Sequence, residues 1–232
     1  MCFSQNNNSN KFESPIDFPI LLSGNFGELR SSGFHSGIDI KTQGKEGLPI
    51  RSIDSGYVAR VQVSTSGFGK VVYIDHGNNI TTVYAHLSEF SDKIEKIMNK
   101  LQYKNKKYEV RKFFKSNELK IGKKEIIGLS GNTGSSFGPH LHFEIRKTDK
   151  ELTINPLYYN FDVKDTIRPY LRSLFLYGIK NGSLRKKQLN LSKVNDSTFT
   201  TGTIKTTDTI GFGVVSSDRQ NKTNNIFGNY KY

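Results

Sequence analysis

The sequence has 232 residues, of which 34% are hydrophobic, and its 34 Lys and Arg residues against 21 Asp and Glu residues give a formal net charge of +13. A hydrophobic fraction of this size can form a packed core, which excludes a globally disordered chain. No run approaches the roughly 18 apolar residues of a membrane-spanning helix, so no membrane span is expected. The only cysteine is Cys2, which excludes an intrachain disulfide.

The positive charge admits two interpretations. It can attract an anionic partner such as a cell wall, a membrane surface or a nucleic acid. It can equally be compositional, because Lys, Asn and Ile are abundant throughout the chain. The lysines lack the interleaved aromatic residues that stack on single-stranded bases, so we expect no nucleic-acid partner.

The first residues, Met1 to Gln5, have neither the basic region nor the apolar region of a secretory leader, so no signal peptide is expected in this chain. No apolar run of the lipobox kind precedes Cys2, which argues against lipidation there. Residues 5–11 are polar and rich in Asn. We expect residues 1–18 to form an N-terminal arm.

From Ile20 onward, short segments rich in β-branched and aromatic residues are separated by Gly and Asp turns. The predicted strands are Ile50–Ile53, Gly56–Val63, Lys70–Asp75, Ile80–His86 and Glu125–Leu129. Closely spaced strands with few helical patterns predict an all-β core.

One segment between these strands has a helical pattern. From Ser88 to about Leu101, apolar residues recur at helical spacing with Lys and Glu between them, which predicts an amphipathic helix. The basic stretch Gln102–Lys120 follows, and we interpret residues 88–120 as an insertion. This insertion is either a solvated surface or a wall of a substrate groove that attracts an anionic glycan.

The character of the chain changes again near Val163, and Asp165–Pro169 has the composition of a boundary. Three later segments are predicted strands rich in Thr, Phe and Val, namely Tyr170–Tyr177, Ser197–Lys205 and Thr209–Ser217. We therefore predict one domain over residues 19–160 and a partial β-rich domain over residues 163–232.

Four of the five histidines fall in three motifs. In the first, His35 and Asp39 are four residues apart, and Gly37 between them disfavours a helix, so a bent strand or loop must bring the two side chains together. Another motif places His86 at the end of an apolar strand. The remaining histidine, His76, lies in a turn and is expected to be exposed and without a role.

The third motif is His140-Leu141-His142, preceded by a Gly-rich segment. In a strand, residues two apart face the same side. His140 and His142 then point together into one site, while Leu141 and Phe143 point into the core. The motif therefore predicts a pair of imidazoles on one face of a strand.

These residues suit the chemistry of a catalytic zinc ion. Such an ion takes three protein ligands from His, Asp or Glu and keeps one position for water, and His35, Asp39 and His142 supply that number. Bound zinc lowers the pKa of water to about 7 and polarises a scissile carbonyl. His86 and His140 then remain to orient the water and to stabilise charge that develops on the carbonyl oxygen.

The segments that carry these residues are similar to the motifs of a known family. Five segments resemble, in order, the motifs of lysostaphin/LytM-type zinc metalloendopeptidases: Phe34–Ile40, Gly69–Gly77, Val83–Leu87, Gly131–Gly134 and Gly138–Glu144. The resemblance spans roughly Pro19 to Pro156. It implies an antiparallel β-sandwich or barrel-like domain of facing sheets, with a groove that holds one Zn²⁺ per chain.

The resemblance also implies roles for individual residues. His35, Asp39 and His142 match the zinc ligands, and His86 and His140 match the catalytic histidines. The implied substrates are peptidoglycan peptides, and the implied location is extracytoplasmic, in the periplasm or cell envelope. The insertion after His86 is longer and more basic than the family minimum. The C-terminal region resembles a β-domain that follows the peptidase in some bacteroidete members.

Two other functions compete with this one. The same fold can form a non-catalytic cell-wall-binding or hydrolase-activating module, which predicts gaps in the set of metal ligands, and this chain has none. Zinc hydrolases of the D-Ala-D-Ala type also use His, Asp and a His-x-His-like element, but their first His and Asp lie further apart. D-Ala to diaminopimelate links and glycine bridges both remain candidate bonds, and no oligomeric state is predicted.

Overall fold

The computed structural model describes residues 12–30, 33–180, 183–206 and 209–228. The expectations for Cys2 and for residues 5–11 lie outside the described residues. The described elements are β1 (Leu22–Gly24), β2 (Leu29–Arg30), β3 (Gly33–Phe34), β4 (Ile38–Lys41), β5 (Pro49–Arg51), β6 (Gly56–Val63), β7 (Lys70–Asp75), β8 (Ile80–Leu87), β9 (Glu89–Phe90), α1 (Asp92–Asn105), β10 (Val110–Phe113), β11 (Lys120–Ile121), β12 (Ile126–Leu129), β13 (His140–Lys147), β14 (Leu152–Ile154), the 3-10 helix η1 (Pro156–Tyr158), β15 (Tyr170–Lys180), β16 (Ser183–Leu189), β17 (Ser192–Lys193), β18 (Phe199–Thr200) and β19 (Thr209–Ser217). The all-β prediction is confirmed.

The largest element of the fold is an antiparallel sheet in the strand order β1-β4-β13-β8-β7-β6-β10, with β11 beside β6 and β14 beside β13. Its central strands are buried on both faces, because on β8 Tyr84 lies in the main hydrophobic cluster while Val83 and Ala85 lie in a second cluster on the opposite face. On β13, for example, Leu141 and Phe143 are fully buried in the core, as predicted. The positions between them carry the histidines.

A smaller antiparallel sheet, in the order β5-β12-β9, lies across the core from the large sheet. Apolar residues of both sheets belong to one hydrophobic cluster, including Ile50, Phe90 and Ile127 from the small sheet and Ile40 and Tyr84 from the large one. The burial of this cluster is the main force that holds the two sheets together. This arrangement agrees with the predicted facing antiparallel sheets.

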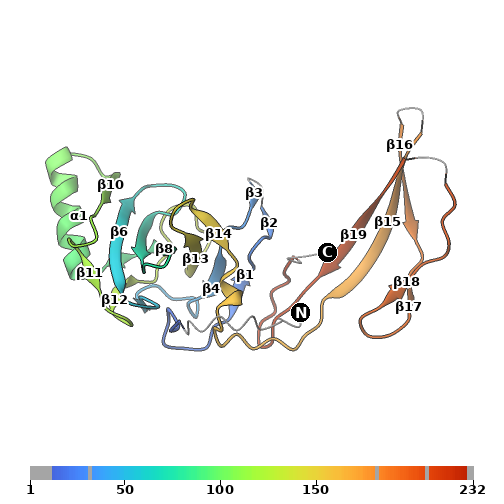
Figure 1. Cartoon of the computed structure of the whole chain (residues 1–232), viewed down its shortest axis with the longest axis horizontal. Coiled ribbons are helices and arrows are strands. Elements are labelled where there is room, and N and C mark those ends of the chain that lie inside the picture. Colours follow the sequence, from blue (N-terminus) through green and yellow to red (C-terminus); the bar gives the residue numbers. More distant parts are fainter. Residues whose placement is uncertain (1–11, 31–32, 181–182, 207–208, 229–232) are drawn as a thin grey trace.

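The predicted insertion forms the end of the domain beside β6. Helix α1 buries Ile94 and Met98, and β10 pairs with β6 at the edge of the large sheet. The helix begins at Asp92 rather than at Ser88, because Glu89 and Phe90 pair with β12 as the short strand β9. Figure 1 shows α1 and β10 at one end of the domain, far from β1, β2 and β3.

The C-terminal strands form a separate three-stranded antiparallel sheet in the order β16-β15-β19, with β17 and β18 as a short ladder of their own. Figure 1 shows this sheet projecting beyond the β1 side of the large sheet. Of the predicted strand Ser197–Lys205, only Phe199–Thr200 forms a ladder. Among the described residues, the only α-helix is α1, and it lacks the length and apolar character that a membrane crossing needs.

Residues 12–18 belong to the packed domain, whereas the sequence predicted that they are part of an N-terminal arm. Phe12 and Ile16 are buried in the main hydrophobic cluster. The Arg51 side chain also pairs with Asp17, with 2.8 Å between Nε and Oδ1. The segment therefore covers one end of the core before the chain enters β1.

Candidate active site

The three predicted metal ligands come together although His142 is more than a hundred residues away from the other two in the chain. Strand β13 pairs with β4, and the register places His142 directly opposite Asp39. The Asp39 Oδ1 atom lies 3.0 Å from His35 Nε2 and 2.9 Å from His142 Nδ1, and the two imidazole nitrogens are 3.1 Å apart. All three side chains are buried. Their potential ligand atoms lie within 4.8 Å of one another.

The outer nitrogen of each imidazole has a partner that fixes the position of its proton. His35 Nδ1 lies 2.7 Å from the carbonyl oxygen of Asn25, and a carbonyl can only accept, so this nitrogen carries the proton. His142 Nε2 lies 2.9 Å from Glu144 Oε1 and likewise donates. In the neutral imidazoles, the lone pairs therefore lie on His35 Nε2 and His142 Nδ1, the two nitrogens that face Asp39.

This donor set fits a zinc ion. Two imidazole lone pairs and a carboxylate oxygen converge on one point, where they repel each other unless a cation or a proton lies between them. Two His and one Asp are a common ligand set for catalytic zinc, and imidazoles anchored by outer hydrogen bonds are typical of metal sites. Burial opposes ionisation of Asp39, but when the imidazoles of His140, His142 and His35 are protonated they outweigh burial and hold the pKa of Asp39 far below its usual range.

The second oxygen of Asp39 is held by Arg30. Arg30 Nη2 donates to Asp39 Oδ2 at 3.0 Å and to Glu28 Oε2 at 3.1 Å. Gly24 makes this approach possible, because a Cβ atom there would lie only 2.3 Å from Arg30 Nη2 and 2.5 Å from Asp39 Oδ2. Asp39 Oδ1 is thus left to face the two ligand histidines.

Glu144 is a fully buried carboxylate behind His142. It follows His142 by two residues on β13 and therefore shares its face. Besides His142, it accepts hydrogen bonds from Arg146 Nε and from the Ser36 hydroxyl. Burial alone would raise the pKa of Glu144, but His142 and Arg146 outweigh it and lower that pKa to about 2. The group is therefore a carboxylate at neutral pH and orients the His142 ring.

His140 lies beside the three predicted ligands. Its Nδ1 is 2.8 Å from the carbonyl oxygen of Gly138, which places the proton on Nδ1. Its Nε2 lies 3.5 Å from Asp39 Oδ1. The lone pair of Nε2 therefore faces the centre where the three ligand atoms meet.

His86 reaches the site through an unusual backbone conformation. Regular alternation on β8 would place it on the core side with Tyr84, whereas Ala85 pairs with His142 on the groove side. His86 has a φ of 61°, a left-handed conformation that is uncommon for a residue other than glycine. This turn brings its ring centroid within 4.8 Å of that of His140. Strain of this kind at a functional position is a recognised feature of active sites.

The His86 ring is oriented by the loop that precedes β13. His86 Nδ1 lies 2.8 Å from the carbonyl oxygen of Thr133, which leaves Nε2 unprotonated and facing the site. The Thr133 hydroxyl donates to Leu87 O at 2.8 Å and accepts from Lys70 N at 3.0 Å, which ties the loop to β7 and β8. Burial, followed by the proximity of His140 and His142, lowers the pKa of His86 to about 4. Its imidazole is therefore neutral at pH 7.

The lack of a side chain at Gly134 allows the loops on this side of the site to touch. Gly134 has a φ of 73°, and a Cβ atom there would lie 2.4 Å from the carbonyl oxygen of Gly67 and from the amide nitrogen of Gly69. The loops are also joined by a hydrogen bond of 2.8 Å from Ser135 N to Gly67 O. The left-handed turn at Gly134 thus fixes the loop that leads into the His140–His142 pair.

An open groove of about 900 Å³ lies over the ligands. Strand β13 lies between β4 and β8 at the floor of the groove. Arg30 and Phe34, from the β2–β3 hairpin, line one wall, and Phe68 and residues 135–139 line the other. The Phe68 ring stacks on that of His142 with 5.0 Å between centroids. Phe34 and Phe137 are strongly exposed on the two rims. The groove can therefore admit an extended polymer segment.

The basic insertion does not contribute to this groove. Residues 88–120, all of which are described, are absent from its lining. They lie beside β6 at the other edge of the large sheet. Of the two interpretations of the insertion, the structure therefore favours a solvated surface over a groove wall.

His76 lies outside the site, as predicted, but it is not the freely exposed side chain that its turn suggested. It is half-buried, with Nδ1 2.9 Å from Ser55 O and Nε2 2.7 Å from Thr82 Oγ1. Burial lowers its pKa below the usual value. These two bonds tie the β7–β8 turn to the loop before β6 and to β8.

Sequence reasoning placed His35, Asp39, His86, His140 and His142 in one site, and the structure brings all five together. It missed three residues that complete the site, namely Arg30, Glu144 and Asn225. Only Glu144 had a usable signal, since it follows His142 at the spacing that defines one face of a strand. The other two act through the fold and carry no local pattern.

Comparisons with known proteins agree with this geometry. The model of Peptidase family M23 matches residues 33–103 and 97–156, which together cover more than half of the chain. The DD-carboxypeptidase/endopeptidase Mpg of Neisseria meningitidis is 33% identical over 118 residues, which cover 51% of this chain and 21% of that protein. The peptidoglycan DD-endopeptidase ShyA of Vibrio cholerae is 30% identical over 137 residues, which cover 56% of this chain and 26% of that protein.

Among solved structures, the catalytic domain of the prophage-encoded M23 protein EnpA from Enterococcus faecalis aligns with a TM-score of 0.47 and 25% sequence identity, covering 66% of this chain and all of that one. The chain spans only about a fifth to a quarter of the length of the two curated relatives. The match to the family model covers β3 to η1 and includes every predicted site residue. The chain belongs to Peptidase family M23.

Proposed function

We propose that this protein is a zinc-dependent endopeptidase that hydrolyses stem peptides or peptide cross-links of bacterial peptidoglycan, outside the cytoplasm. The observation that carries the proposal is the convergence of His35, Asp39 and His142, with Asp39 Oδ1 within 3.0 Å of both imidazoles. Two uncoordinated imidazoles lie beside this centre in an open groove. The names of the relatives Mpg and ShyA, an endopeptidase and a peptidoglycan endopeptidase, support the choice of substrate.

His35 Nε2, Asp39 Oδ1 and His142 Nδ1 are the atoms that would hold the zinc ion. When bound, such an ion supplies Lewis-acid polarisation of the scissile carbonyl and acidifies a water. The residues around it keep the ligands in position: Arg30 holds Asp39, Glu144 holds His142, and the Asn25 carbonyl holds His35. This positioning reduces the reorganisation that the ligands need when the metal binds.

The His86 and His140 pair carries the proton transfers. Both rings have their proton on Nδ1 and a free lone pair on Nε2. One of them accepts the proton of the attacking water as its oxygen bonds to the carbonyl carbon, and the pair returns a proton to the amide nitrogen as the C–N bond breaks. The protonated ring also stabilises the negative charge on the carbonyl oxygen. Peptide hydrolysis consumes one water and leaves a carboxylate and an amine.

The test is digestion of purified cross-linked peptidoglycan and of defined fragments, read by mass spectrometry. We expect the chain with one zinc ion bound to release peptide fragments, a chelator to stop the release, and added zinc to restore it. The masses also identify the bond that is cut. Full activity after chelation with no metal returned would contradict the zinc mechanism. A zinc-free chain that cleaves nothing but stimulates an amidase on the same wall would favour the hydrolase-activating module.

Replacing Glu144 with Gln is expected to weaken zinc binding by about 10- to 100-fold, the usual effect of losing an outer partner of a metal ligand. Gln keeps an oxygen near His142 but loses the charge that makes the imidazole a stronger donor. The dissociation constant is measured by competition with a chromogenic chelator. Glu151→Gln is the control, because Glu151 pairs with the same Arg146 but is exposed and has no contact with His142. Equal zinc affinity in Glu144→Gln and wild type would contradict the role of Glu144.

A further inference from the structure

After β19 the chain returns to the catalytic domain, and residues 218–228, here called the return segment, lie against β1. Gln220 is buried, and its amide makes two hydrogen bonds with the edge of the large sheet. Gln220 Oε1 accepts from Leu22 N at 2.8 Å, and its Nε2 donates to Ile20 O at 3.1 Å. The side chain thus satisfies the backbone groups that a neighbouring strand would otherwise bond.

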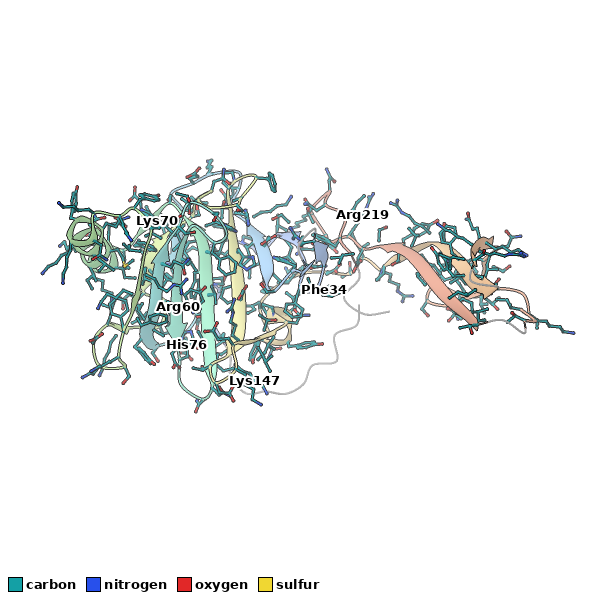
Figure 2. All side chains as sticks on the ribbon, turned by 90° about the horizontal axis from the view of Figure 1, so that it is seen from above. Phe34, Arg60, Lys70, His76, Lys147 and Arg219 are labelled. Atoms are coloured by element: carbon teal, nitrogen blue, oxygen red, sulfur yellow. The ribbon has the colours of Figure 1, made fainter. Side chains whose placement is uncertain are left out.

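The return segment is closed on itself and anchored in the core. Asp218 and Phe227 form an isolated antiparallel bridge, with hydrogen bonds of 3.0 and 2.9 Å in the two directions. Phe227 is buried in the main hydrophobic cluster of the catalytic domain. Figure 2 shows Arg219, in this segment, and Phe34, in β3, between the large sheet and the C-terminal sheet. The segment is therefore held in place at both of its ends.

A short chain of hydrogen bonds connects the return segment with the metal centre. Gly228 N donates to Glu28 Oε1 at 3.0 Å. The other oxygen of Glu28 accepts from Arg30, whose Nη2 atom also reaches Asp39 Oδ2. The position of the return segment is thus tied to that of the groove wall that contains Arg30.

One side chain of the return segment lines the groove. Asn225 lies among the lining residues next to Ser23 and Arg30. Its backbone nitrogen donates to Thr223 Oγ1 at 3.2 Å, and its Oδ1 accepts from the same hydroxyl group at 3.0 Å. Its Nδ2 makes only a long contact of 3.5 Å with Ser23 O. A carboxamide held in this way can both donate to and accept from the backbone of an extended peptide.

We infer that the return segment is part of the substrate groove, and that Asn225 binds the peptide backbone of the substrate on the β1 side of the metal centre. Gln220 and Phe227 are positioning residues that hold Asn225 there. The inference rests on the proposed function and deepens it. The return segment lies outside residues 33–156, which match the family model, so the match assigns it no function. The C-terminal strands then contribute to substrate binding as well as to the architecture.

The experiment uses the full zinc-loaded chain with the peptidoglycan fragment that the wild type cleaves best. We expect Asn225→Ala to raise KM about three- to tenfold, the equivalent of one hydrogen bond, with kcat and zinc affinity little changed. Asn224→Ala is the matched control, because this neighbouring asparagine is exposed and does not line the groove. Gln220→Ala should raise KM in the same direction and accelerate hydrogen exchange at the Leu22 amide.

The outcomes separate this inference from the proposed function. An unchanged KM in both Asn225→Ala and Gln220→Ala, with an active wild type, overturns the inference and leaves the endopeptidase proposal intact. If the wild type cleaves no fragment, binding of the intact fragment is titrated by NMR instead. Equal affinity of wild type and Asn225→Ala then overturns the inference as well. If Gln220→Ala fails to fold, the KM or the affinity of Asn225→Ala alone decides whether the inference holds.

Discussion

Replacing His142 with Ala is expected to abolish both stoichiometric zinc binding and peptidoglycan hydrolysis. The substitution removes one of three ligand atoms that converge within 4.8 Å, and it leaves the buried Glu144 without its imidazole partner. Metal-ion catalysis contributes several kcal/mol to the transition state, and about 1.4 kcal/mol corresponds to a factor of ten. We therefore expect hydrolysis to fall by about a thousandfold or more. Asp39→Ala should have the same effect, because Asp39 Oδ1 faces both ligand histidines.

The measurement pairs metal analysis after dialysis with the rate of fragment release. His76→Gln is the control for removal of a histidine, because His76 is half-buried outside the site and its imidazole bonds Ser55 and Thr82. It should keep one zinc ion per chain and wild-type turnover. Circular dichroism of the zinc-free proteins checks that each variant is folded. A His142→Ala protein with a full complement of zinc and near-normal turnover would remove His142 from the ligand set.

The parts of the fold that sequence predicted well are those with a local signal. Strands β6, β7 and β19 begin and end at the predicted residues, because each is a β-branched run bounded by turn residues. Strand β13 also follows its period of two, which places His140 and His142 on one face and Leu141 in the core. This periodicity is why the sequence alone predicts a pair of imidazoles on one face of a strand.

The parts that sequence missed depend on contacts between distant segments. Strand β16 contains the polar run Arg185 to Gln188 and has little intrinsic strand preference, yet it forms because β15 offers it a ladder. The bonds of Gln220 to Leu22 and Ile20 span about 200 residues, so no local pattern could reveal them. His86 is a different case, because its left-handed backbone reverses the side that alternation predicts. Only the tertiary contacts with the Thr133 loop explain that reversal.

The second candidate function, a non-catalytic wall-binding module, predicts a defect in the ligand set or its surroundings. No such defect is present among the described residues of the site. Each ligand has an outer partner, and both additional imidazoles have a lone pair that faces the centre. A module that only binds its target has no need for these proton positions. This geometry supports the proposed endopeptidase, and variants of His86 and His140 test that proposal most directly.

Replacing His140 with Ala is expected to lower kcat by about 100- to 10,000-fold, the usual contribution of a positioned acid or base, while zinc binding remains stoichiometric. His140 Nε2 lies 3.5 Å from Asp39 Oδ1, further away than either ligand imidazole, so the three ligands persist without it. Metal analysis and steady-state kinetics on the same fragment measure the two effects separately. Loss of the zinc together with the activity would instead identify His140 as a ligand.

The double variant His86→Ala/His140→Ala tests whether the two imidazoles act as a unit. Their ring centroids are 4.8 Å apart, and each is oriented by a separate backbone carbonyl, those of Thr133 and Gly138. If one proton passes through both rings, removal of either breaks the transfer, and the double variant should be hardly slower than each single one. If one ring transfers the proton and the other stabilises the carbonyl oxygen independently, the losses should multiply. The short distance between the rings favours the first result.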